Sequence, residues 1–142
     1  MSVSLEFVDT NVLLYAVDHT EEKKQALAEA LLDRLWRDHS GCLSVQVLQE
    51  FYVNATRKLS TPLDPDTARQ VIEDYSVWIV HAPTSASVLA AVDLQQQHQV
   101  SFWDAMILES AQALGAVALW SEDLNAGQRF GGLEVRTPFA VS

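Results

Sequence analysis

The chain has 142 residues, the length of one domain, of which 49% are hydrophobic and 20% charged. These values are close to the globular average and exclude a disordered chain. The charge is less ordinary, because nine Lys and Arg oppose nineteen Asp and Glu and give a formal net charge of −10. A protein that held nucleic acid only by neutralising phosphates should be basic, so this charge argues against a simple DNA-binding module.

Cysteine content and hydropathy indicate the compartment. The single cysteine, Cys42, excludes an intramolecular disulfide and a cysteine-rich zinc site, and it fits a reducing cytosol. No apolar run approaches the roughly 18 residues of a membrane span, and no charged segment precedes the first apolar stretch. The sequence therefore predicts a soluble, cytoplasmic protein, one domain over residues 1–142, with no membrane partner.

The N-terminal half alternates short strands with helices. The expected elements are a strand over 5–8, a helical turn over 11–17, a helix over 20–39, a strand over 41–43 and a helix over 44–59. Ser44 is a good N-cap for the last of these helices. Its apolar residues follow helical spacing and predict the buried face: Val45, Leu48, Tyr52, Ala55 and Leu59.

The C-terminal half continues the alternation. The expected elements are a helix from Pro65, a strand over 77–80, helices over 84–98 and 101–115, a strand over 116–120 and a short strand over 133–135. Asp64 precedes a proline at the first helical position, and Thr84 and Ser101 are suited to cap the two later helices. Residues 116–120 are apolar on both faces, as a central parallel strand should be.

This order predicts an α/β fold with a mainly parallel sheet of about five short strands, flanked by helices on both faces. In such sheets ligands bind beyond the carboxyl ends of the strands. Two carboxylates stand at such ends, Asp9 after the first strand and Asp123 after residues 116–120. A turn or a helix cap is the alternative role for each, because Asp readily bonds to local backbone.

Asp104 lies on a predicted helix. With Ser101 it forms a Ser-x-x-Asp pattern typical of a helix cap. It also shares a helical face with apolar residues such as Ile107, where an ionised carboxylate needs a cation or a hydrogen-bond donor. No Lys or Arg occurs over residues 102–128, so the partner must come from elsewhere, and a metal ion is one candidate. Glu109 points nearly the opposite way and is expected to be solvated.

Four acids together make a sharper hypothesis than any one of them. Glu50 lies opposite the apolar stripe of its helix and alone would be a solvated residue. Carboxylates that converge beyond one sheet edge repel one another unless divalent cations lie between them. Oxygen ligands select Mg²⁺ or Mn²⁺ rather than Zn²⁺. The histidines show no paired metal-ligand spacing, and none is expected to be catalytic; they are His19, His39, His81 and His98.

Four segments resemble, in order, the motifs of the PIN-domain family, and in particular of VapC-type toxins from bacterial toxin–antitoxin pairs. They are Phe-Val-Asp-Thr-Asn at 7–11, Val-Leu-Gln-Glu-Phe at 47–51, Ser-Phe-Trp-Asp-Ala at 101–105 and Ser-Glu-Asp-Leu-Asn at 121–125. Residues 137–139 resemble the closing segment of the family, so the resemblance covers essentially the whole chain. Trp103 stands where Tyr is commoner, and Thr137 where Asn often precedes Pro-Phe; neither departure touches an acid.

The resemblance implies a small endoribonuclease that uses Mg²⁺, with Mn²⁺ as a substitute. The family's metal-binding acidic positions match Asp9, Glu50, Asp104 and Asp123. Glu50 is either a ligand or the group that orients the attacking water. Supporting roles fall to Thr10, to Asn11, which orders its turn, and to Ser121, which would position an acid or a phosphate oxygen. Candidates for contacts with RNA are Arg57, Lys58 and Arg129, each of which could instead be an ordinary surface charge.

The resemblance also implies partners. A VapB-like antitoxin would place its tail, with a basic side chain, in the acidic cleft. Similar proteins form homodimers, and Trp36 and Trp78 are either interface aromatics or core residues. The net charge is then partly that of the acid cluster, and the protein is expected to bind RNA weakly without metal.

Two alternatives remain open. A phosphatase of the haloacid dehalogenase type also places Asp after the first strand, but its chemistry needs a second Asp two residues later, where this chain has Asn11. A catalytically silent PIN-fold scaffold or RNA-binding module is the other alternative. It is less favoured, because an inactive site has no need for mutually repelling carboxylates.

Overall fold

The computed structural model describes residues 3–139. A six-stranded sheet in the order β3-β2-β1-β4-β6-β5 forms its centre. The strands are β1 (Glu6–Val8), β2 (Gly41–Ser44), β3 (Ile79–His81), β4 (Ala118–Trp120), β5 (Arg129–Phe130) and β6 (Leu133–Arg136). All neighbouring strands pair in parallel except β5 and β6, which are antiparallel. The predicted α/β class and mainly parallel sheet are confirmed.

The strand count exceeds the prediction by one because β5 was missed. This strand has only two residues, too few to show any periodicity, and it pairs with β6 across a turn in which Gly131 has a φ of 64°. The predicted strand over 77–80 begins later, at Ile79.

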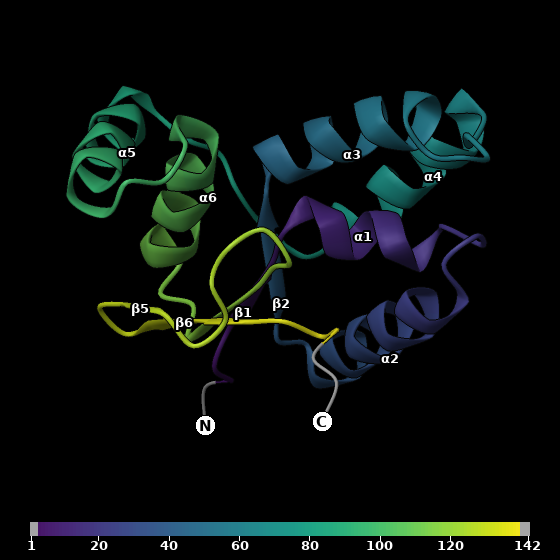
Figure 1. The fold of residues 1–142 in the computed structure, drawn as a ribbon, viewed down its shortest axis with the longest axis horizontal. Coiled ribbons are helices and arrows are strands. Elements are labelled where there is room, and N and C mark those ends of the chain that lie inside the picture. The colour runs from purple at the N-terminus through teal and green to yellow at the C-terminus, as the bar shows by residue number, and fades with distance from the viewer. Residues whose placement is uncertain (1–2, 140–142) are drawn as a thin grey trace.

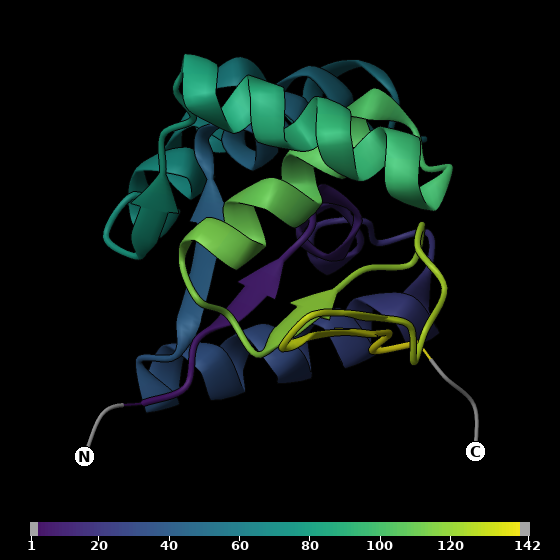
Figure 2. The same ribbon diagram turned by 90° about the vertical axis from the view of Figure 1, so that its left-hand side faces the viewer.

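Six helices surround the sheet within residues 3–139 (Figures 1 and 2). They are α1 (Thr10–Ala16), α2 (Glu22–Asp38), α3 (Val45–Arg57), α4 (Pro65–Tyr75), α5 (Ser85–His98) and α6 (Phe102–Ala113). Figure 1 shows α5 and α6 on one side of β1 and β2, with α2 on the other. The predicted caps are present, since the side chains of Ser44, Asp64 and Ser101 each accept a hydrogen bond from the backbone N–H three residues later. Within residues 3–139, none of these helices has both the length and the apolar composition needed to cross a membrane.

The buried face of α3 differs from the predicted stripe. Ala55 is buried as predicted, but Val45 and Tyr52 are exposed, and Val47 and Phe51, outside the predicted stripe, are buried. The helix packs against both α1 and α4, so two of its sides are covered, and an apolar stripe read from the sequence does not reveal which sides these are. As a consequence, the polar side that carries Glu50 faces inward.

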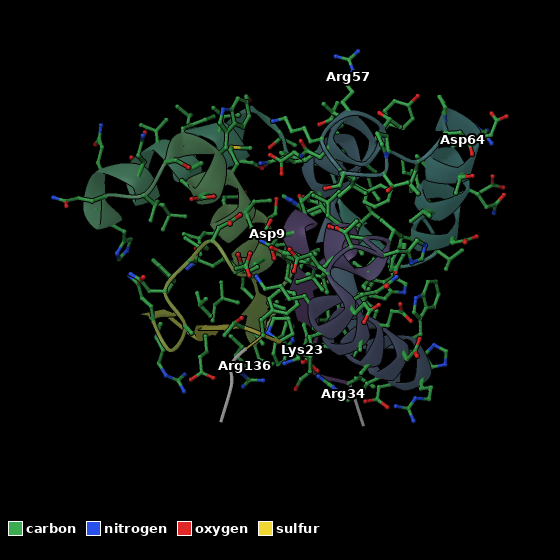
Figure 3. The ribbon with its side chains drawn as sticks, turned by 45° about the vertical axis from the view of Figure 1, so that its right-hand side comes forward. Asp9, Lys23, Arg34, Arg57, Asp64 and Arg136 are labelled. Atoms are coloured by element: carbon green, nitrogen blue, oxygen red, sulfur yellow. The ribbon has the colours of Figure 1, made fainter. Side chains whose placement is uncertain are left out.

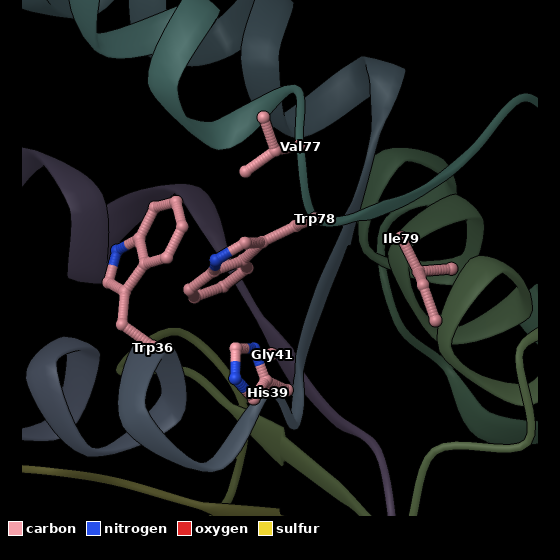
Figure 4. Close-up of a pocket in the computed structure, with 6 residues that line it drawn as sticks. All are labelled: Trp36, His39, Gly41, Val77, Trp78 and Ile79. Carbon is pink, nitrogen blue, oxygen red and sulfur yellow. The ribbon is translucent and has the colours of Figure 1, made fainter.

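Trp36 and Trp78 belong to an aromatic cluster at the β3 edge of the sheet. Both indoles pack against Tyr75, with ring centroids 4.8–5.3 Å apart within the cluster. Gly41 on β2 lies directly against the Trp78 ring, and a Cβ at this position would overlap the ring (Figure 4). The cluster therefore joins α2, α4 and the start of β3, although both indoles remain partly open to solvent.

Candidate active site

The direction of the chain across the sheet reverses at β1. From β1 the chain runs outward through β2 to β3, and it later returns to β4 on the other side of β1. Ligands of parallel sheets bind in the crevice at such a reversal, beyond the carboxyl ends of the strands. Asp9 directly follows β1, and Ser121 directly follows β4.

A pocket of about 200 Å³ opens at this edge, and all four predicted acids line it. Asp9 comes from the junction of β1 and α1, Glu50 from the middle of α3, Asp104 from the first turn of α6 and Asp123 from the loop after β4. The fold thus brings together carboxyl groups that lie more than 100 residues apart in the sequence. Thr10 and Asn11 also line this pocket.

Asp9 is the most buried of the four acids, with only 4% of its surface exposed. Its Oδ1 accepts the backbone N–H of Thr10 at 2.7 Å, and its Oδ2 accepts the Ser121 hydroxyl at 2.8 Å. Burial raises the pKa of Asp9 to about 7; the two hydrogen bonds oppose this rise, and the charges of Asp123 and Glu50 add to it. The carboxyl group is therefore close to half-ionised at neutral pH, and a cation nearby would favour its charged form.

Glu50 is held by two side chains. The Thr10 hydroxyl donates to Oε1 of Glu50 at 2.8 Å. The side chain of Thr10 therefore positions Glu50 on α3 and not the adjacent Asp9. The Gln46 amide donates to Oε2 of Glu50 at 3.3 Å and to the backbone oxygen of Trp103 at 3.2 Å. Gln46 therefore links α3 to the start of α6.

Sequence reasoning missed this role of Gln46. The residue is 9% exposed and lines the pocket, and its Oε1 atom has no hydrogen-bond partner among the described residues. The available signal was its position one turn before Glu50, on the same helical face. Because a polar residue on a helix is usually solvated, the burial of Gln46 was not expected.

Asn11 fixes the loop after β4. Its amide donates to Oδ2 of Asp123 at 3.2 Å and to the Ser121 hydroxyl at 3.3 Å, and its oxygen accepts the backbone N–H of Glu122 at 3.2 Å. Glu122 itself turns away to pair with Lys24 and to accept the Tyr15 hydroxyl. Of the two adjacent acids, Asp123 is the one that faces the pocket.

Ser101 caps α6, as the sequence pattern indicates, while the Asp104 carboxyl group faces the pocket. The backbone N–H of Asp104 donates to the Ser101 hydroxyl at 3.1 Å. Burial raises the pKa of the Asp104 carboxyl, and Asp123 and Glu50 add to that rise against the opposing Ser101 hydroxyl. The prediction that Glu109 is solvated was wrong: it is 8% exposed, because α6 is covered by α5 on one side and by the sheet on another.

The predicted RNA contacts do not gather at the pocket. Arg57 lies near the end of α3 and projects outward, away from Asp9 (Figure 3). Arg129 pairs with Glu134 at 3.2 Å on the β5–β6 hairpin. Lys58 lines an adjoining pocket that shares Asn11 with the acid pocket. Of the three, only Lys58 lies beside the acids.

The donor set of the pocket fits a hard divalent cation. Its charged groups are carboxylates, and oxygen ligands select Mg²⁺ or Mn²⁺ over Zn²⁺. Across residues 3–139, no three Asp, Glu, His or Cys side chains are grouped closely enough to surround an ion by themselves. Mg²⁺ usually keeps several waters and takes only one or two carboxylates, so this arrangement fits an ion bound partly through water.

The comparison with known families identifies the fold. The family model described as PIN domain matches residues 7–129. The chain belongs to the PIN domain family. The resemblance seen in the motifs is therefore confirmed at the level of the family, and all four acids lie within the matched PIN domain.

Several solved structures have a similar fold. A toxin–antitoxin complex from Klebsiella pneumoniae superposes with a TM-score of 0.71 at 18% identity, over 96% of this chain and 99% of that one. DNA-bound VapBC from Salmonella typhimurium gives a TM-score of 0.67 at 18% identity, over 96% of this chain and 99% of that one. Mycobacterium tuberculosis VapC20, a toxin that cleaves the sarcin–ricin loop, gives a TM-score of 0.61 at 21% identity, over 82% of this chain and 90% of that one. At these identities the likeness shows a common fold. The sequence matches no curated protein.

Proposed function

We propose that this PIN domain is a metal-dependent endoribonuclease of the VapC type, which hydrolyses phosphodiester bonds in RNA. The observation that carries the proposal is the convergence of four carboxyl groups on one pocket at the reversal point of the sheet. Hydrogen bonds from neighbouring side chains hold three of these acids in place, as a prearranged site requires. Membership of the PIN domain family supports the proposal.

Asp9, Asp104 and Asp123 are the residues that would hold one or two Mg²⁺ or Mn²⁺ ions, directly or through water. When bound, the metal lowers the pKa of a water molecule and stabilises the charge on the departing oxygen. Glu50, fixed by Thr10 and Gln46, is either a further ligand or the group that orients this water. Ser121 is fully buried and donates to Asp9, so its role is to hold that acid rather than to touch phosphate.

The proposal is tested with purified protein and a labelled RNA, with Mg²⁺, with Mn²⁺ and with EDTA. Cleavage should require metal and stop with EDTA. Asp104→Asn should lower the cleavage rate at least 100-fold, as the removal of a charge from a prearranged catalytic site typically does. Asp93→Asn removes the same charge from an exposed position on α5 and should leave the rate unchanged. Full activity of Asp104→Asn would refute the site.

The phosphatase alternative receives no support from the geometry. The amide of Asn11, which stands where that chemistry needs a second Asp, donates to both Ser121 and Asp123 and, unlike a carboxyl group, cannot act as a general acid or base. A silent scaffold remains the alternative to test, and it would be favoured by metal binding without cleavage of any RNA.

We further propose a VapB-like antitoxin as the natural inhibitor and a cytoplasmic location for the pair. Two of the similar solved structures are a toxin–antitoxin complex and a VapBC complex. A pocket lined by four carboxyl groups would attract a basic side chain on the antitoxin tail. If the reading frame next to this one encodes no small DNA-binding protein, the antitoxin proposal should be abandoned.

A homodimer is proposed as well. Apolar side chains on the outer face of α3 are exposed in the single chain, namely Val45, Tyr52 and Val53. Light scattering should give a mass near twice 15.8 kDa. A monomer at micromolar concentration would contradict this proposal without affecting the nuclease proposal.

A further inference from the structure

Trp103 presents a large aromatic surface to solvent at the acid pocket. Its side chain is 63% exposed and lines the same pocket as Asp9, Asp104 and Asp123. The chain's other three tryptophans are only partly exposed. A single exposed apolar residue is ordinary on a protein surface, so the location of Trp103 and the way it is held are what matter.

Trp103 is held from two sides. Its backbone oxygen accepts the amide of the buried Gln46 at 3.2 Å, and the ring of Phe102 packs edge-on against its indole, with centroids 5.1 Å apart. The residue also lies in the first turn of α6, which Ser101 caps. Because the Phe102 ring restrains the indole, less conformational freedom is lost when a ligand covers it.

The charge of the pocket makes stacking the favourable way to bind RNA there. None of the described residues that line it is Lys, Arg or His, whereas four carry carboxyl groups. The phosphate backbone is therefore repelled at the pocket except where metal intervenes. Stacking of a base on an aromatic ring does not depend on positive charge and contributes substantially to the binding of single-stranded nucleic acid.

We propose that Trp103 is the stacking platform for an unpaired nucleobase beside the scissile phosphate. The inference rests on the proposed nuclease function and adds a residue that would bind the substrate beside the acids. A base inside a duplex is already stacked on both faces and offers none to the indole, so this contact would require an unpaired base.

The test compares steady-state cleavage by the wild-type protein, Trp103→Phe and Trp103→Ala on a short single-stranded RNA with Mn²⁺. Loss of one stacked base should raise the KM of Trp103→Ala about tenfold, with kcat changed far less, because stacking binds ground state and transition state alike. Trp103→Phe keeps a ring and should stay within about threefold of wild type. Leu89→Ala removes an equally open apolar side chain on α5, 68% exposed, and should change nothing.

A second substrate distinguishes stacking from a general loss of structure. An abasic nucleotide next to the cleaved bond should raise the KM of the wild-type protein about tenfold. It should not raise the KM of Trp103→Ala further, because this variant already lacks the stacking contact. Equal costs in both proteins, or a wild-type KM for Trp103→Ala, would overturn the inference and leave the nuclease function intact. A wild-type protein that cleaves no RNA would overturn both the inference and the proposed function.

Discussion

Replacing Asp9 with Asn should stabilise the metal-free protein at pH 8 while it abolishes cleavage. Burial raises the pKa of Asp9 from 3.8 to about 7. Between these two values the unfolded chain releases its proton while the folded chain keeps it, so stability falls as pH rises from about 4 to about 7 and stays level above that. The free energy of unfolding that the wild-type protein loses in this way amounts to roughly 4 kcal/mol at pH 8. Asn does not ionise, so the variant avoids this loss.

Part of this gain is offset by hydrogen bonding. The Asn amide would face the Ser121 hydroxyl, which already accepts hydrogen bonds from the Asn11 side chain and the Asp123 backbone. Disturbing this arrangement should cost about 1–2 kcal/mol. The net gain of roughly 2–3 kcal/mol corresponds to a rise in Tm of about 6–10 °C for a chain of this length. At pH 4 only the cost remains, and the variant should melt slightly below wild type.

The assay is thermal unfolding in EDTA at several values between pH 4 and pH 8. Asp93→Asn makes the same charge change at an exposed site and should stay within about 0.5 kcal/mol of wild type throughout. The reasoning is refuted if Asp9→Asn is the less stable protein at pH 8, or if its difference from wild type is the same at pH 4 and pH 8.

Three further outcomes test other parts of the molecule. Mn²⁺ at 100 times its dissociation constant should add about 2.7 kcal/mol to the stability of the wild-type protein, and no rise in Tm at millimolar metal would contradict a preformed site. Gly41→Ala should lose about 1–3 kcal/mol in urea unfolding, because the new methyl group meets the Trp78 ring. Arg34 makes two hydrogen bonds of 2.9 Å to Glu6 and thereby holds the pKa of that acid below 4.5. Arg34→Gln should therefore cost about 0.5–1 kcal/mol at pH 7, and the difference should disappear at acid pH, where Glu6 becomes protonated.

Two acids of the candidate site, Asp9 and Asp123, could be expected at one sheet edge because parallel strands point their carboxyl ends to the same edge. Glu50 was indicated only by the resemblance of its segment to a family motif, and the pairing of β1 with β4 is seen only in the structure. The caps followed from local chemistry, since Ser44 and Ser101 act within one helical turn.

Features that depend on packing between distant elements could not be predicted. The inward turn of Gln46 and the burial of Glu109 arise where α3 and α6 are covered on more than one side, and an isolated helical wheel does not contain that information. No sequence pattern places Arg57 or Arg129 relative to the acids. Only the structure reveals that Arg57 projects away from Asp9 (Figure 3), that Arg129 pairs with Glu134, and that neither lines the acid pocket.

The most direct test of the account is the rate of RNA cleavage as a function of Mg²⁺ concentration, measured for the wild-type protein and for Asp123→Asn. If carboxylates hold the metal, wild-type cleavage should be absent in EDTA and saturate with Mg²⁺, and the variant should need roughly ten times more metal to reach half its maximal rate. Cleavage that persists in EDTA, or a metal dependence that Asp123→Asn does not change, would contradict the central claim.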